Sequence, residues 1–140
     1  MSFEFIAVDP GRAKCGLAVM SSDGDVVEKL VAPTENLTGI ASELTRSHPG
    51  VDRIVIGSGT GSGGIVEKLR SSSGLPGRIE TVAEKNSTLE ARRLFEKEHP
   101  LPWPLRILPY WIFSSYKGID AYAAVIIGER YLKELREKRK

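Results

Sequence analysis

The N-terminal part of the chain alternates between short apolar runs and turn-forming residues. The run from Phe3 to Val8 is too short for the core of a helix, and it ends at Asp9, before a Pro-Gly turn. A run of this kind predicts a strand that is buried on both faces. A second apolar run, Cys15 to Met20, follows the turn, so the pattern predicts an antiparallel partner for the first strand.

The same two periodicities continue along the chain. Leu37, Ile40, Ala41 and Leu44 recur at the helical spacing, and the residues after them, His48, Pro49 and Gly50, end a helix. Ser87 and Glu90 have the spacing of a capping box, which predicts the start of another helix. We expect further strands at 26–31, 51–57 and 79–82, and helices at 37–47, 65–70, 87–99 and from 119 to the end of the chain.

The order of these elements predicts the fold class. Three antiparallel strands are followed by helix, strand, helix, strand and closing helices, which is typical of the α/β ribonuclease H-like fold. We therefore expect a central mixed five-stranded sheet, three strands antiparallel and then two parallel, flanked by helices, with the first strand at its centre. A chain of 140 residues is long enough for one core and short for two, so we expect a single domain over residues 1–140.

Composition narrows the class of protein. Hydrophobic residues make up 41% of the chain and charged residues 27%, which is ordinary for a globular domain and argues against disorder. There is no apolar run of about 18 residues and no signal-peptide pattern at the N-terminus, so we expect a cytoplasmic protein that does not enter membranes. The net charge of +2 is too small to indicate a nucleic-acid partner by itself. Cys15 stands alone in an apolar strand, which predicts a small buried core residue.

Acidic residues stand at the ends of predicted elements. Asp9 and Glu84 each follow a buried strand, and Asp120 stands in the first turn of the last helix. On the ribonuclease H-like topology we expect them to converge at one edge of the sheet, where they would repel one another unless divalent cations neutralise them. Mg²⁺ or Mn²⁺ suits such a site, because it takes oxygen ligands and leaves places for water and a substrate phosphate. This chemistry predicts phosphodiester hydrolysis.

Two further stretches leave alternatives open. The glycine-rich stretch from Ser58 to Gly64 is either a phosphate-backbone contact or a flexible connector. The stretch from Pro100 to Gly118 is rich in proline and aromatic residues, and it is a flap over the core, a platform on which unpaired bases stack, or a dimer face. Monomer and homodimer are therefore both open.

Three separate segments carry a family resemblance. They are Ala7 to Met20 (AVDPGRAKCGLAVM), Ala83 to Arg92 (AEKNSTLEAR) and Asp120 to Leu132 (DAYAAVIIGERYL). In this order and spacing they resemble the YqgF family, also described as RuvX-like or Holliday junction resolvase-like. Its members are proposed nucleases in maturation of the 5′ end of 16S rRNA.

The resemblance implies a ribonuclease H-like fold and assigns roles to residues. It implies metal-bound, catalytic acids at Asp9, Glu84 and Asp120, and it implies that Arg12 lies near the scissile phosphate. In the same segments we expect further substrate contacts from these residues: Lys14, Lys85, Ser87 and Thr88.

The chain departs from the family pattern at one motif. Family members generally have Asp-Glu-Arg where this chain has Ala83, Glu84 and Lys85, and many also have an acid where Ile119 stands. Two hypotheses follow. One is a metal-dependent endonuclease that acts on structured RNA or branched DNA, and the other is a nucleic-acid-binding or ribosome-assembly module that has lost its chemistry. A third hypothesis, an actin-like sugar kinase or ATPase, needs a duplicated domain and a second phosphate loop, for which we expect 140 residues to be too few.

Overall fold

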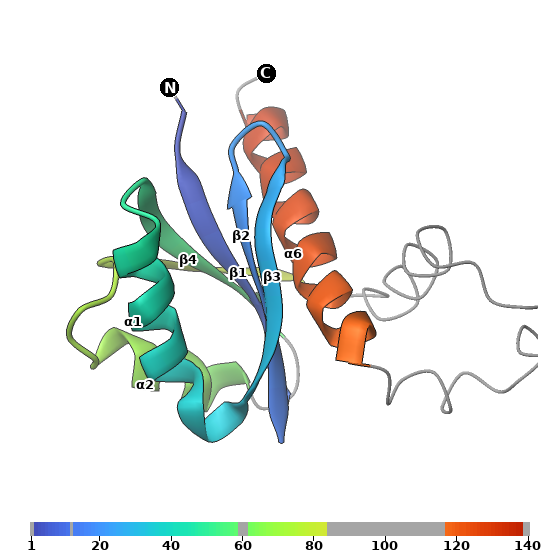
Figure 1. The fold of residues 1–140 in the computed structure, drawn as a ribbon. Coiled ribbons are helices and arrows are strands. Elements are labelled where there is room, and N and C mark those ends of the chain that lie inside the picture. The colour runs from blue at the N-terminus through green and yellow to red at the C-terminus, as the bar shows by residue number, and fades with distance from the viewer. Residues whose placement is uncertain (1, 12, 59–61, 84–116, 139–140) are drawn as a thin grey trace, which may run out of the picture.

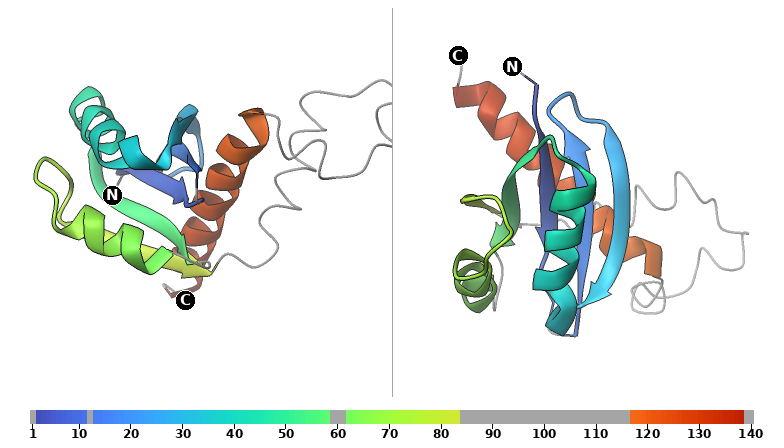
Figure 2. Two further views of the ribbon diagram at one scale, coloured as in Figure 1. Left: turned by 90° about the horizontal axis from the view of Figure 1, so that it is seen from below. Right: turned by 60° about the vertical axis from the view of Figure 1, so that its left-hand side comes forward.

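The computed structural model describes residues 2–11, 13–58, 62–83 and 117–138. Its elements, in chain order, are β1 (Glu4–Asp9), β2 (Lys14–Ser21), β3 (Val26–Pro33), the short 3₁₀ helix η1 (Thr34–Asn36), α1 (Leu37–Ser47), β4 (Val51–Ser58), α2 (Ser62–Arg70), β5 (Arg78–Ala83) and α6 (Lys117–Lys138). The strands form one sheet in the order β3-β2-β1-β4-β5. Helices α1 and α2 lie on one face of this sheet and α6 on the other (Figure 1, Figure 2).

The sheet confirms the expected topology. β1 is central, pairs antiparallel with β2 and parallel with β4, and β3 and β5 form the two edges. β2 pairs antiparallel with β3, and β4 pairs parallel with β5. The sheet therefore has the predicted three antiparallel and two parallel strands. No helix in the four described ranges is long and apolar enough to cross a membrane.

Two helices begin earlier than the sequence pattern predicts. α2 begins at Ser62 rather than Ile65, and α6 begins at Lys117 rather than Ile119. Gly63, Gly64 and Gly118 are therefore helical, and the helices include them because a glycine costs a helix only about 1 kcal/mol. The predicted helix at 87–99, the aromatic stretch up to residue 116 and residues 59–61 of the glycine-rich stretch lie outside the described residues.

β1 is buried on both faces, as its apolar run predicts. Phe5, Ile6, Ala7 and Val8 are each 0% exposed. Phe5 and Ala7 belong to the core that α6 covers, whereas Ile6 and Val8 belong to the core on the side of α1 and α2. Alternate residues of one strand thus hold the two layers together.

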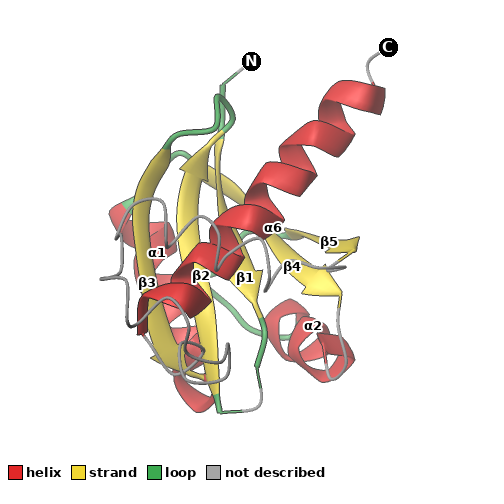
Figure 3. Cartoon of the chain, turned by 90° about the vertical axis from the view of Figure 1, so that its right-hand side faces the viewer, coloured by secondary structure: helices red, strands yellow, loops and turns green. Residues whose placement is uncertain are grey.

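α6 packs tightly against the sheet at Gly128. It crosses the sheet diagonally (Figure 3). A Cβ atom on Gly128 would lie 2.3 Å from Sδ of Met20 and 3.2 Å from Cε2 of Phe5. Both of these side chains are 0% exposed, so a close-packed interior surrounds them and they have little room to move away.

The second half of α6 is joined to β4 and β5 by a polar network. Arg53 of β4 is buried, and its Nη1 donates a hydrogen bond to the Tyr131 hydroxyl at 2.8 Å. The Tyr131 hydroxyl in turn donates to Glu80 of β5. Nε of Arg53 donates to Oδ1 of Asp52 at 2.7 Å, and this bond lowers the pKa of the Asp52 carboxyl. Burial, followed by the bond to Glu80, raises the pKa of the Tyr131 hydroxyl.

We expect Gly128→Ala to destabilise the fold by about 1–3 kcal/mol, because the added methyl group overpacks the contact with Met20 and Phe5. Gly39→Ala is the matched control, since Gly39 is also helical and a Cβ there meets nothing within 4 Å. This control should stabilise by up to about 1 kcal/mol. Urea unfolding of both variants measures the difference, and equal effects would contradict the close approach at Gly128.

We expect Tyr131→Phe to cost about 1–3 kcal/mol near pH 8, because it leaves the buried Nη1 of Arg53 without its acceptor. The cost should shrink at higher pH. The folded-state pKa of Tyr131 is raised, so its contribution is fully present below the unfolded pKa of about 10 and is lost as pH rises through the folded value. Urea unfolding of wild type and variant at pH 8 and pH 11 measures this change; an equal difference at both values would refute it.

Candidate active site

Asp9 is the last residue of the central strand and is partly buried. Strand alternation places it on the same face as Phe5 and Ala7, the face that α6 covers. Its cross-strand partner on β2 is Gly16. Because glycine has no side chain, β2 contributes only backbone directly opposite the Asp9 carboxylate.

The parallel strands β4 and β5 have their carboxyl ends at the same end of the sheet as Asp9. β4 ends at Ser58 and β5 at Ala83, and these two residues are register partners. Oγ of Ser58 donates to the carbonyl of Val82 at 3.0 Å, which joins the two strand ends. β4 lies between β1 and β5, so β1 and β5 are about 10 Å apart at a spacing of about 4.8 Å per strand.

Glu84 follows directly after β5 in sequence but lies outside the described residues. Four of the predicted substrate-contacting residues also lie outside the described residues: Arg12, Lys85, Ser87 and Thr88. Their roles stay predictions.

Lys14 is the predicted substrate contact that the structure places beside Asp9. It is the first residue of β2, exposed, and two residues before Gly16, so it lies on the same face and diagonal to Asp9. Diagonal neighbours in an antiparallel pair are about 7–8 Å apart, within reach of a long side chain. The fold therefore allows one substrate phosphate to meet both the Lys14 ammonium and whatever the Asp9 carboxylate holds.

Asp120 lies in the first turn of α6, on the side of β3. Two residues later, Tyr122 accepts a hydrogen bond from Nζ of Lys29 of β3 at 3.0 Å, and the same ammonium lies 4.1 Å from the centre of the ring. The start of α6 is thus fixed to the edge strand, whereas Asp9 is on the central strand with β2 between them. The side chain of Asp120 is not among the described ones, so the convergence of the three acids stays a prediction.

Thr34, to which the sequence pattern assigns no role, contacts the turn between β1 and β2. Its Oγ1 donates to the carbonyl of Gly11 at 2.8 Å, and its N–H donates to the carbonyl of Ala13 at 3.0 Å. Sγ of Cys15 lies 3.3 Å from the same Oγ1. The sequence signal at Thr34 is a strand end after Pro33, and nothing local relates it to a residue 23 positions earlier.

A divalent cation fits the part of the donor set that is described. Of the predicted ligands, Asp9 alone has a described side chain, and a carboxylate oxygen is a donor that Mg²⁺ and Mn²⁺ accept. Within the described ranges there is no group of three or more His, Cys, Asp or Glu side chains placed to hold a metal ion. A complete site therefore needs donors beyond these ranges.

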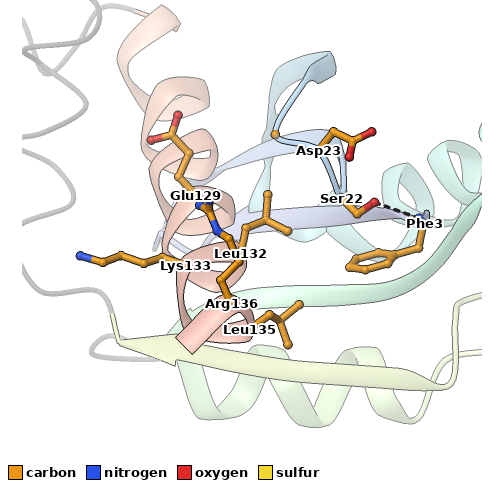
Figure 4. Close-up of a pocket in the computed structure, with 9 residues that line it drawn as sticks. Phe3, Ser22, Asp23, Glu129, Leu132, Lys133, Leu135 and Arg136 are labelled. Atoms are coloured by element: carbon orange, nitrogen blue, oxygen red, sulfur yellow. Dashed lines mark hydrogen bonds between the residues drawn. The ribbon is translucent and has the colours of Figure 1, made fainter. Parts of the chain in front are cut away.

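A groove of about 750 Å³ lies at the opposite end of the sheet (Figure 4). Phe3 and Ser22, where β1 begins and β2 has ended, line one side of it. Leu132 and Arg136 of α6 line the other. The six residues of β1 span about 20 Å, so this groove is not part of the candidate active site.

No protein-family model matches the chain, and no curated protein matches it. Solved structures do. A Fowlpox virus resolvase, solved in complex with substrate Holliday junction DNA, shares 15% identity at a TM-score of 0.60, and the match covers 95% of this chain and 99% of that one. RuvC from Thermus thermophilus shares 14% identity at a TM-score of 0.51, and the match covers 96% of each chain. The fold is ribonuclease H-like. At these identities the likeness shows the fold alone.

The chain also matches part of a sugar-kinase structure. The Lmo2764 protein from Listeria monocytogenes, a proposed N-acetylmannosamine kinase, shares 16% identity at a TM-score of 0.44. The match covers 71% of this chain and 41% of that protein, so the chain spans less than half of that relative. A TM-score this low carries no argument about function.

Proposed function

We propose that this chain is a metal-dependent endonuclease that cleaves phosphodiester bonds in structured or branched nucleic acid. The observation that supports it is a partly buried carboxylate, Asp9, at the carboxyl end of the central strand of a ribonuclease H-like sheet. Matches over almost the full length of a resolvase that was solved with Holliday junction DNA and of RuvC agree with this proposal. We infer, from the three sequence segments, membership of the YqgF family.

The site chemistry follows from the residue types. Asp9, Glu84 and Asp120 would hold Mg²⁺ or Mn²⁺, which activates a water molecule and stabilises the leaving oxygen when bound. The Asp9 carboxyl is partly buried, and a bound cation stabilises the charged form of a carboxyl in such a place. The ammonium of Lys14 would attract the substrate phosphate to this edge.

The substrate is either a four-way DNA junction or precursor 16S rRNA. The resemblance to the YqgF family favours processing of the RNA 5′ end. The match to a resolvase that was solved with Holliday junction DNA favours the branched DNA. Both substrates belong in the same assay, because in each the bond to be cleaved is a phosphodiester.

We expect Asp9→Asn to reduce cleavage at least about 100-fold, because it removes a charged metal ligand while keeping the shape of the side chain. Asp25→Asn is the matched control, since Asp25 lies in the exposed turn after β2. The assay is cleavage of a synthetic four-way junction and of a 5′-extended RNA hairpin with Mg²⁺, with Mn²⁺ and with a chelator. Cleavage that survives the chelator, or that Asp9→Asn leaves unchanged, would refute the assignment.

A second candidate is a nucleic-acid-binding module that does not cleave. The observation that favours it is the residue at the end of β5, which is Ala83 where family members generally have an acid. The edge opposite Ser58 therefore offers one carboxylate fewer than the family pattern. Such a module would bind RNA or DNA in a salt-sensitive way with no metal-dependent cleavage.

The double variant Ala83→Asp with Lys85→Arg separates the two candidates, because it restores the family triplet. If the wild-type chain is the nuclease that we propose, we expect its cleavage rate to change less than about threefold. If the chain is the binding module, cleavage should appear only in the double variant. The rates of both proteins on the same junction and hairpin, at equal occupancy, make the measurement.

A further inference from the structure

We propose that Thr34 is a positioning residue for substrate binding, because it fixes the turn that joins Asp9 to Lys14. This inference rests on the proposed function and concerns the nucleic-acid phosphate at the same edge. Thr34 follows β3 and begins η1, so it belongs to neither of the two strands that carry Asp9 and Lys14. It nevertheless makes two hydrogen bonds to the turn between them.

The turn between β1 and β2 is tight. A Cβ atom on Gly11 would lie 2.3 Å from the carbonyl oxygen of Lys14, which is a backbone atom. The chain therefore turns so tightly that the backbone of Gly11 packs against the backbone of Lys14. This turn is the covalent connection between Asp9, which ends β1, and Lys14, which begins β2.

Thr34 holds this turn through hydrogen bonds to its backbone. Oγ1 of Thr34 donates to the carbonyl of Gly11, and the N–H of Thr34 donates to the carbonyl of Ala13, so one residue engages both sides of the turn. Pro33, directly before Thr34, is the register partner of Lys14. The end of β3 thus fixes the turn and the start of β2 together.

The Thr34 hydroxyl has two hydrogen-bond partners, the Gly11 carbonyl and the Cys15 thiol. The single hydroxyl hydrogen of Thr34 goes to Gly11, so Oγ1 can only accept from its other neighbour, the thiol of Cys15 at 3.3 Å. Cys15 is 0% exposed, and its S–H is therefore the donor that orients the Thr34 hydroxyl. The order of donation is Cys15 thiol to Thr34 hydroxyl to Gly11 carbonyl.

The consequence is a binding effect rather than a chemical one. The two hydrogen bonds that Thr34 donates go to the backbone of the turn. Its loss would displace the Lys14 ammonium relative to Asp9 and weaken substrate capture. The displacement should appear in KM and in the dissociation constant for nucleic acid, with kcat little changed.

The test compares three variants of the full chain. Thr34→Val keeps the shape and removes the hydroxyl, whereas Thr34→Ser keeps the hydroxyl. Thr45→Val is the matched control, because Oγ1 of Thr45 also donates to a backbone carbonyl at 2.8 Å, that of Ala41, but within α1. The measurements are KM, kcat and the dissociation constant on the four-way junction and the RNA hairpin.

We expect Thr34→Val to raise KM and the dissociation constant about tenfold with kcat within about twofold, and Thr34→Ser and Thr45→Val to stay near wild type. If wild type is active but Thr34→Val matches Thr45→Val, the positioning role is overturned and the proposed function stands. If wild type binds but does not cleave, the dissociation constants alone decide the role of Thr34. If wild type neither binds nor cleaves either substrate, both proposals fall.

Discussion

Burial of β1 on both faces is the constraint on which the rest of the structure depends. Phe5 and Ala7 close the core under α6, and Ile6 and Val8 close the core under α1 and α2. All four are fully buried, so neither layer packs without this strand. The run ends at Asp9, whose carboxylate lies where the buried layer meets the edge of the sheet. The strand that builds the core therefore also delivers the candidate catalytic acid.

The fold separates its stabilising contacts from its candidate active site. The polar network of Arg53, Tyr131 and Glu80 lies near the starts of β4 and β5, and the close approach of α6 at Gly128 is to Phe5 near the start of β1 and Met20 near the end of β2. The candidate site lies at the other end, where β1, β4 and β5 finish. We therefore expect substitutions at the candidate site to change the cleavage rate with little loss of folding stability. Substitutions in the polar network should instead lower the folding stability.

The position of α6 links these two regions. Its second half is bonded to β4 and β5 through Tyr131, and its first half is bonded to the opposite edge strand, β3, through Tyr122 and Lys29. The helix is therefore held at both ends across the whole sheet. These contacts, rather than the sequence of the first turn itself, determine where the first turn of α6 lies, and this turn contains Asp120.

Thr34 shows the same principle on a smaller scale. Its two hydrogen bonds join the end of β3 to a turn more than 20 residues earlier in the chain. The turn itself is tight because the backbones of Gly11 and Lys14 are in contact. A residue with no predicted role thus controls the relative placement of two residues that have one.

The sequence by itself determined the strands and the helix at α1, because these follow from local periodicity and turn chemistry. The order of the elements along the chain also indicated the sheet topology, through its likeness to the ribonuclease H-like fold. It also singled out Asp9 and Lys14, whose roles stay predictions, and the fold places Lys14 diagonal to Asp9 across the β1–β2 pair. It supplied no reason for a buried arginine at position 53, whose partner Tyr131 is 78 residues away.

Only the tertiary structure decided which distant residues meet: Gly128 with Met20, Arg53 with Tyr131, and Thr34 with Gly11. These contacts depend on strand order, register and the crossing of a helix, none of which is encoded in neighbouring residues. Whether Glu84 and Asp120 join Asp9 belongs to the same class of question, since carboxylates from three separate segments meet only through the packing of whole elements.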